Sequence, residues 1–298
     1  MAGTGASGKA RGDLTRATTT VALVVNERSG GTNPALCVER LRSFGGDVMR
    51  FDPDEIDDAL ASGAERIVVA GGDGSIAPVA AAAGAAGIPL AVVPAGTAND
   101  FARRMGLPEG ITAACRLAVR GQRLRSLELG WMNGERPFVN VASAGLPAPA
   151  AWHASSWKDR VGPLAYAAGA VRAGLTAKPL TCLVECDDRE LLAGGAWQVT
   201  VAASGAFGGG TTIEEADPGD GAFDVIAIEA GPRLGLMAVA YRLRSGGLTN
   251  HPRAFHTRCE QVKVQVPDRT EFNVDGEVVT AGDARFRALR GAFRLVVG

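Results

Sequence analysis

A single aspartate among glycines is the first arrangement in this sequence that could do chemistry. Asp73 stands in the stretch Gly71-Gly72-Asp73-Gly74-Ser75, after the apolar run "RIVVA" and before an alanine-rich stretch. Glycines permit positive φ angles and let a phosphate approach the backbone, and N–H groups at a helix start point toward such an anion. Because its charge repels phosphate, Asp73 would reach a bound Mg²⁺ or a ribose hydroxyl. The alternative is a tight strand-to-helix turn with Ser75 as N-cap.

A second polar loop, "VVPAGTANDFARR", also follows an apolar run and opens a predicted helix. Thr97 and Asp100 match a capping box, which by itself explains both residues. Asn99 and Arg103 are four positions apart, so a helix would place them on one face near the same edge of the sheet. The sequence therefore predicts two polar, glycine-bearing strand ends beside each other.

The elements that must position these loops alternate between strand and helix. Runs such as "TTTVALVVN" and "ERIVVAGG" predict strands, whereas "NPALCVERLRSFG" and "GITAACRLAVRG" have helical spacing. Continuous apolar strands separated by helices predict a parallel sheet covered on both faces. Ligands bind such sheets at the carboxyl ends of the strands, which is where both loops stand.

After about residue 124 the pattern changes to short β runs broken by Gly, Asp and Pro, with Asn133-Gly134 as a turn signal. We expect a second, mainly antiparallel β-sandwich domain, interrupted by one helix over about residues 161–175. The predicted division is a flexible tail over residues 1–17, an α/β domain over residues 18–125 and a β-rich domain over residues 126–284. This division leaves open whether the final strand, about residues 285–298, returns to the first domain.

The bulk composition of the 298 residues excludes several classes of protein. Hydrophobic residues make up 46% and charged residues 21%, which is typical of a globular protein, and the net charge of −1 gives no reason to expect nucleic acid. The five scattered cysteines predict buried, reduced thiols and a cytoplasmic protein. No apolar run approaches the roughly 18 residues of a membrane span, and the first residues do not read as a signal peptide.

Several motifs in a fixed order then resemble a known family. "GGDGS", followed by "PAGTANDFAR" and late in the chain by "FNVDGE", resembles the catalytic domain of the diacylglycerol kinase-type lipid kinases, which bacterial diacylglycerol kinases share with sphingosine and ceramide kinases. "NERSGG", "FVNVASAGL" and "FGGGTTIEEADPGDGAFDVIAI" resemble further segments of that family, so the resemblance covers about residues 20–298. It implies an α/β nucleotide-binding domain like that of NAD kinase and phosphofructokinase, a β-rich domain for the lipid substrate, and the cofactors ATP and Mg²⁺.

The resemblance also implies roles for individual residues. Asp275 would be the general base that accepts the proton of a lipid hydroxyl, with Glu277 beside it, and Asp73, Asp100 and Arg103 would organise the phosphates and the catalytic Mg²⁺. A second, structural Mg²⁺ would bind to the Asp220 carboxylate and to backbone carbonyls of Asp217 and Ala222. The residues implied to line the ATP site are Asn26, Glu27, Arg28, Ser29, Gly30, Gly72, Asp73, Gly74, Ser75, Ile76, Ala77, Pro78, Thr97 and Asn99. Without the resemblance, "NVDGE" and "ADPGDG" are ordinary turn sequences.

The chain departs from the family pattern in ways that keep two alternatives open. Ala77-Pro78 stands where the family usually has Asn-Glu, and "GLPAPA" after Gly145 replaces a more acidic segment. These departures motivate the alternative of a non-catalytic relative that binds nucleotide or lipid. The other alternative is an enzyme like NAD kinase, which carries a similar glycine turn; the "GTANDFAR" segment argues against it.

The resemblance implies a lipid substrate, and a chain in which no membrane-spanning run is predicted must reach that substrate at the membrane surface. Trp152, Trp157, Lys158 and Arg160 precede the helix expected over residues 161–175 and suit transient contact with a membrane surface, at the inner face of the membrane. The alternative is an ordinary helix that docks on the β domain. The sequence does not identify the acceptor lipid. It also leaves the oligomeric state open, and a homodimer is one of the states that it allows.

Overall fold

The structure, a computed structural model, describes residues 18–25, 33–146, 178–207, 211–212, 216–232 and 252–298. The predicted tail over residues 1–17, the first nucleotide loop from Asn26 to Gly30 and the aromatic segment with its expected helix lie outside these residues. No helix in the described part of the chain is long and apolar enough to cross a membrane.

The first domain is built on parallel strands in the order β4, β3, β1, β2, as the apolar runs predict. Its strands are β1 (Thr19–Val25), β2 (Gly46–Phe51), β3 (Arg66–Gly71) and β4 (Leu90–Pro94). Its helices are α1 (Pro34–Ser43), the 3₁₀ turn η1 (Pro53–Glu55), α2 (Ile56–Ala61), α3 (Asp73–Ala85), α4 (Asp100–Arg104) and α5 (Ile111–Arg120).

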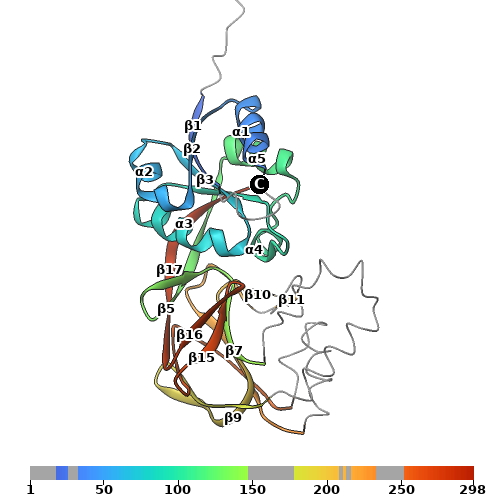
Figure 1. Ribbon diagram of the computed structural model, residues 1–298, viewed down its shortest axis with the longest axis vertical. Coiled ribbons are helices and arrows are strands. Elements are labelled where there is room, and N and C mark those ends of the chain that lie inside the picture. Colours follow the sequence, from blue (N-terminus) through green and yellow to red (C-terminus); the bar gives the residue numbers. More distant parts are fainter. Residues whose placement is uncertain (1–17, 26–32, 147–177, 208–210, 213–215, 233–251) are drawn as a thin grey trace, which may run out of the picture.

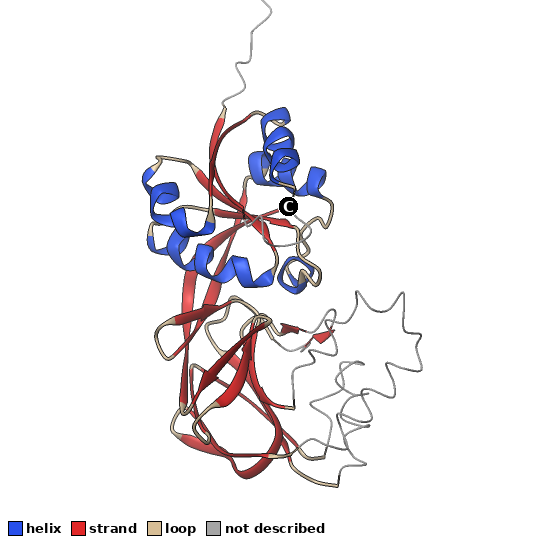
Figure 2. Cartoon of the chain, in the orientation of Figure 1, coloured by secondary structure: helices blue, strands red, loops and turns tan. Residues whose placement is uncertain are grey.

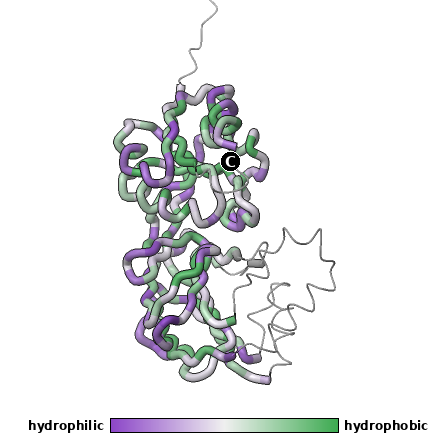
Figure 3. The backbone as a smooth tube through the Cα atoms, in the orientation of Figure 1, coloured by the Kyte–Doolittle hydropathy of each residue, from purple (hydrophilic) through white to green (hydrophobic). Residues whose placement is uncertain are grey.

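Helices cover both faces of this sheet, because successive strand residues point to opposite sides. On one face Ile67 and Val69 pack with α2, α3 and α4. On the other face Val68 and Ala70 pack with α1 and α5. The hydrophobic stretches accordingly gather in the centre of the domain, whereas hydrophilic ones lie outside (Figure 3). The strand that carries the glycine turn is therefore held rigidly from both sides.

The second domain is mainly antiparallel and β-sandwich-like, as predicted (Figure 2). Its central sheet runs β16, β15, β7, β9, β8, β14, and β9 also pairs with β12, which pairs with β13. Its strands are β6 (Arg136–Phe138), β7 (Val141–Gly145), β8 (Leu180–Cys186), β9 (Arg189–Ala202), β10 (Ala206–Phe207), β11 (Thr211–Thr212), β12 (Phe223–Glu229), β13 (Ala254–Cys259), β14 (Gln261–Gln265), β15 (Thr270–Val274) and β16 (Glu277–Ala281).

Two long strands, β5 (Arg123–Met132) and β17 (Ala284–Val297), run from one domain into the other (Figure 1). They pair antiparallel along both of their halves, with an irregularity between Leu289 and Phe293. The end of β17 also pairs in parallel with β4 through Leu295, and its start pairs with β14. Because both strands belong to both domains, they form a continuous frame that fixes how the two domains are placed on either side of the cleft between them.

Gly84 is where α3 packs on this frame. A Cβ added there would lie 2.0 Å from the carbonyl oxygen of Ala292 in β17. Alanine normally stabilises a helix relative to glycine by about 1 kcal/mol, but here we expect Gly84→Ala to destabilise the protein by about 1–3 kcal/mol through overpacking. Urea unfolding measures the difference. Gly110→Ala is the control, because nothing lies within 4 Å of its added Cβ; equal effects of the two variants would contradict this account of α3.

Candidate active site

Asp275 lies in the turn between β15 and β16, which the Asp-Gly pair predicts. Asp275 and Gly276 both have positive φ, 48° and 91°, as a two-residue hairpin turn requires. The carboxylate folds back onto the segment between β6 and β7. There the backbone N–H of Val139 donates to Oδ2 at 2.7 Å, and the N–H groups of Asn140 and Val141 donate to Oδ1 at 2.9 and 3.0 Å. The turn therefore holds Asp275 toward the interior.

The surroundings of Asp275 raise the pKa of its carboxyl group to about 7. Burial is the largest cause, and the charge of Asp73 adds to it, whereas the three backbone hydrogen bonds act in the opposite direction. A carboxylate oxygen can accept two hydrogen bonds, and of the two oxygens Oδ1 accepts two backbone bonds while Oδ2 accepts one. Oδ2 is therefore the better placed atom to take a proton from a ligand.

Asp73 is the first residue of α3, and its carboxylate stabilises the start of α4. Oδ2 accepts from the N–H of Asp100 at 3.0 Å, and Oδ1 accepts from the N–H of Phe101 at 2.9 Å. The alternative explanation of Thr97 and Asp100 as a capping box is wrong, because Asn99 and not Thr97 stands at the N-cap of α4 and Asp73 supplies the acceptor. Ser75 is not an N-cap either, since α3 begins two residues earlier.

The two glycine-bearing loops lie side by side, as the sequence predicts. A Cβ on Gly96 would lie 2.5 Å from the Cα of Gly72, so only glycine allows this approach. Asn99 has a left-handed φ of 50°, and its side chain accepts from the N–H of Gly96 and donates to the carbonyl of Gly96, each at 2.9 Å. The Arg103 guanidinium pairs with Asp100 at 3.1 Å and with Glu109 at 3.6 Å.

Asn140 brings the two carboxylates together, and the sequence analysis missed it. Its backbone N–H contacts Asp275, and its side-chain Nδ2 donates to Oδ1 of Asp73 at 3.2 Å. A polar residue between the apolar pairs of "FVNVA" is a weak signal, since such residues are common at strand ends. The structure thus places the late β hairpin opposite the glycine turn.

A cavity of about 320 Å³ opens where the domains meet. It is lined by Gly74, Ala77 and Pro78 of α3, by Glu135, Arg136 and Pro137 before and in β6, and by Val274, Asp275 and Glu277 of the hairpin. Glu277 pairs with Nη1 of Arg136 at 2.7 Å, and a Cβ on Gly74 would lie 3.2 Å from its Oε1. Of the other residues predicted to line the ATP site, Ile76 is buried in the core and exposes no side chain to a ligand.

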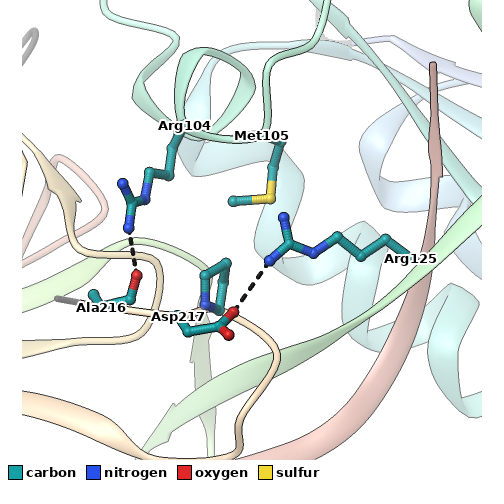
Figure 4. Close-up of a pocket in the computed structure, with 6 residues that line it drawn as sticks. Arg104, Met105, Arg125, Ala216 and Asp217 are labelled. Atoms are coloured by element: carbon teal, nitrogen blue, oxygen red, sulfur yellow. Dashed lines mark hydrogen bonds and ion pairs between the residues drawn. The ribbon is translucent and has the colours of Figure 1, made fainter. Parts of the chain in front are cut away.

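The acidic turn after residue 215 lies beside a second cavity, of about 300 Å³. Arg104 and Arg125 reach this turn from the first domain (Figure 4): Arg104 donates to the carbonyl of Ala216, and Arg125 pairs with Asp217 at 3.1 Å. Asp220 accepts from the N–H of Ala222 at 3.0 Å and pairs with Arg258. These contacts order the turn and occupy the Asp220 carboxylate, which was predicted to bind the metal.

Glu128 is a further residue that the sequence analysis missed. It is buried in β5, and Oε2 accepts from the N–H of Gly221 at 2.6 Å. Its Oε1 is buried without a hydrogen-bond partner in the described structure, and burial raises the pKa of the carboxyl group to about 7. Within the described ranges, no three Asp, Glu, His or Cys side chains gather as a metal-ligating group. The charges of Asp217 and Asp224 add to this rise in the pKa of Glu128, and the charge of Arg258 opposes it.

The structure defines a two-domain protein in which a parallel α/β domain faces a β domain across a polar cavity, and comparisons with known proteins show its family. Residues 20–131 match the diacylglycerol kinase catalytic domain, and residues 140–297 match the YegS C-terminal NAD kinase beta sandwich-like domain. The chain belongs to the diacylglycerol kinase family of lipid kinases, which are phosphotransferases.

Individual relatives agree with this assignment. The chain is 30% identical over 220 residues to the diacylglycerol kinase of Bacillus subtilis, covering 72% of this chain and 71% of the relative. It is also 30% identical over 283 residues to a protein of Pseudomonas aeruginosa named probable lipid kinase YegS-like, covering 92% and 88%. A crystal structure of a diacylglycerol kinase from Bacillus anthracis has the same fold, with a TM-score of 0.72 at 21% identity over 94% of this chain and 97% of that one.

Proposed function

We propose that the protein transfers the γ-phosphate of ATP to the hydroxyl group of a lipid alcohol such as a diacylglycerol, with Asp275 as general base. One observation supports this above all: the Asp275 carboxylate and the glycine turn line the same cavity. Phosphoryl transfer depends on positioning and charge neutralisation more than on covalent chemistry. The acceptor hydroxyl would donate to Oδ2 of Asp275, which takes its proton as the phosphoryl group arrives.

The residues around the cavity fit a nucleotide that arrives with Mg²⁺. Glu135, Asp275 and Glu277 outnumber Arg136 there, so the cavity wall is acidic and a bare triphosphate would be repelled. The divalent cation would supply the charge that neutralises the transferring phosphate. Gly72 and Gly74 carry no side chain that would cover the backbone, and phosphate oxygens would approach it beside Gly96 and Glu277. Thr97 and Asn99 would contact the nucleotide from the second loop, and Arg103, held by Asp100, would face its phosphates.

We also propose a second Mg²⁺ at the acidic turn, held by the Asp220 carboxylate and the carbonyls of Asp217 and Ala222. Oxygen ligands suit Mg²⁺, and the unpartnered Oε1 of Glu128 supports added positive charge nearby. Arg258, which now pairs with Asp220, would give up this contact to the metal.

Removing that metal should therefore loosen the fold. After treatment with a chelator, added Mg²⁺ is expected to raise the melting temperature of the wild-type protein, with about 2.7 kcal/mol of stabilisation at a hundredfold excess over the dissociation constant. Asp220→Asn should abolish this response. The control Asp188→Asn removes an exposed carboxylate paired with Lys263 and should keep it. A response that survives in Asp220→Asn would contradict the site.

The proposed acceptor is held in membranes, so we propose transient contact with the inner membrane surface by a protein otherwise in the cytoplasm. Trp152 and Trp157, the residues suited to this contact, lie outside the described residues. A homodimer is compatible with this arrangement.

An acceptor screen tests the function directly. The protein, radiolabelled ATP and Mg²⁺ are incubated with mixed micelles of a diacylglycerol, a phosphatidylglycerol or a sphingoid base, and separately with NAD. We expect label in one lipid and none in NAD. Label in NAD alone would identify an NAD kinase, and label in no acceptor despite ATP binding would identify a non-catalytic relative.

A further inference from the structure

Asn140 occupies the point where the two halves of the candidate active site meet. It lies between β6 and β7 in the β domain and is 3% exposed. Its backbone N–H donates to Asp275, and its side-chain Nδ2 reaches Asp73 at 3.2 Å. One residue therefore contacts the carboxylate on the late hairpin and the carboxylate at the glycine turn, which belong to different domains.

Ser204 and Asp73 together fix the orientation of the Asn140 amide. The fully buried Ser204 hydroxyl donates to Oδ1 of Asn140 at 2.7 Å. With Oδ1 directed at a donor, Nδ2 must face Asp73, which as a carboxylate can only accept. A flipped amide would set two acceptor oxygens against each other, 3.2 Å apart, and would leave the hydroxyl without its present acceptor.

The backbone around these two residues is equally well paired. The N–H of Ala203 donates to the carbonyl of Asn140 at 2.9 Å, and the N–H of Ser204 donates to the carbonyl of Val139 at 3.2 Å. From the first domain, Nε of Arg104 in α4 donates to the carbonyl of Ser204 at 3.0 Å. The Asn140–Ser204 pair is thus joined to α4 on one side and to the Asp275 hairpin on the other.

We propose that Asn140, oriented by Ser204, is a positioning residue that sets the separation between the glycine turn and Asp275. This inference rests on the proposed function, because it assumes that phosphate at the turn must meet a hydroxyl at Asp275. The side-chain amide is a neutral donor to Asp73, and the backbone N–H of the same residue donates to Asp275. The amide holds Asp73 toward the β domain without adding a third charge. An ordinary buried polar residue would stabilise the fold but would not control the rate of transfer.

Asn140→Ala tests the role of the side-chain amide alone. Alanine keeps the backbone N–H that donates to Asp275 and removes only the amide that donates to Asp73. Misplacing reacting groups by about 1 Å can cost about a hundredfold in rate. We therefore expect kcat to fall by about 30- to 100-fold, with KM for ATP changed by less than about threefold. Ser204→Ala keeps the Asn140 amide but removes the hydroxyl that donates to its Oδ1. We expect this variant to lower kcat by a smaller factor than Asn140→Ala.

Thr200→Val is the matched control. Thr200 is a buried polar residue of β9 whose hydroxyl accepts from Gln198 at 3.1 Å and, in the described structure, is not bonded to either carboxylate. It should lose comparable thermal stability and keep kcat. The inference is overturned if Asn140→Ala keeps kcat within twofold of wild type, or if Thr200→Val loses as much kcat. A wild-type protein that labels no lipid would instead overturn the proposed function, so the two failures are distinguishable.

Discussion

Replacing Asp275 by asparagine is expected to lower kcat by about a thousandfold while ATP still binds. General-base catalysis typically contributes about 10²- to 10⁴-fold, and asparagine cannot take the proton. Steady-state transfer of label from ATP to the lipid identified in the acceptor screen measures the loss, and calorimetry measures ATP binding. Turnover within tenfold of wild type would contradict the role of Asp275.

The same substitution also has a structural effect that must be separated from the chemical one. Both oxygens of Asp275 accept backbone N–H groups, and the amide NH₂ of asparagine would oppose one of these donors. We expect a loss of about 1–3 kcal/mol in the free energy of unfolding. Asp283→Asn is the matched control. Asp283 also accepts a backbone N–H, from Val266 at 3.2 Å, but does not line the cavity. We therefore expect the Asp283→Asn variant to have the kcat of the wild-type protein.

Asp73→Asn is expected to weaken both the fold and the reaction. The carboxylate accepts from Asp100 N–H, Phe101 N–H and Asn140 Nδ2, and asparagine offers only one oxygen to these donors. We expect the free energy of unfolding to fall by about 1–3 kcal/mol and kcat/KM for ATP to fall by about a hundredfold. Urea unfolding and initial rates at low ATP measure the two effects.

The control for Asp73 is an aspartate that caps an exposed turn. Asp52 stands at the N-terminus of η1 and takes part in a capping box with Glu55. Asp52→Asn should change neither quantity appreciably, since asparagine is as good an N-cap as aspartate. If Asp73→Asn behaved in the same way, Asp73 would be a surface cap and the glycine turn would not depend on it.

The sequence predicts the local elements of this protein well because they follow from nearby residues. The apolar run over residues 66–71 is long enough for a buried strand and too short for a helix, and it forms β3. Asp275-Gly276 predicts a tight hairpin turn because both positions need positive φ, and the structure has it. All five cysteines are buried and free of disulfides, as their scattered spacing suggests.

What could not be predicted depends on contacts between distant segments. Asp73 caps α4 from 27 positions away. Near α4 the sequence shows only the capping-box motif of Thr97 and Asp100, and nothing in it points to Asp73. Asn140 contacts Asp73 and Ser204, which are 67 and 64 positions away, so its type alone says little. Glu128 carries a signal in hindsight, because a charge inside the apolar run "LELGWM" needs a partner when the strand is buried.

The pH dependence of kcat/KM tests the central claim most directly. With ATP and lipid both well below their KM values, the rate reports the ionisation of groups in the free enzyme, and burial and Asp73 raise the pKa of Asp275 to about 7 there. We expect kcat/KM to rise with pH along a limb whose midpoint lies near 7, because the active, deprotonated form replaces the protonated one. A kcat/KM that stays constant from about one and a half pH units below this midpoint to the same distance above it would contradict the assignment of Asp275 as the base that faces the glycine turn.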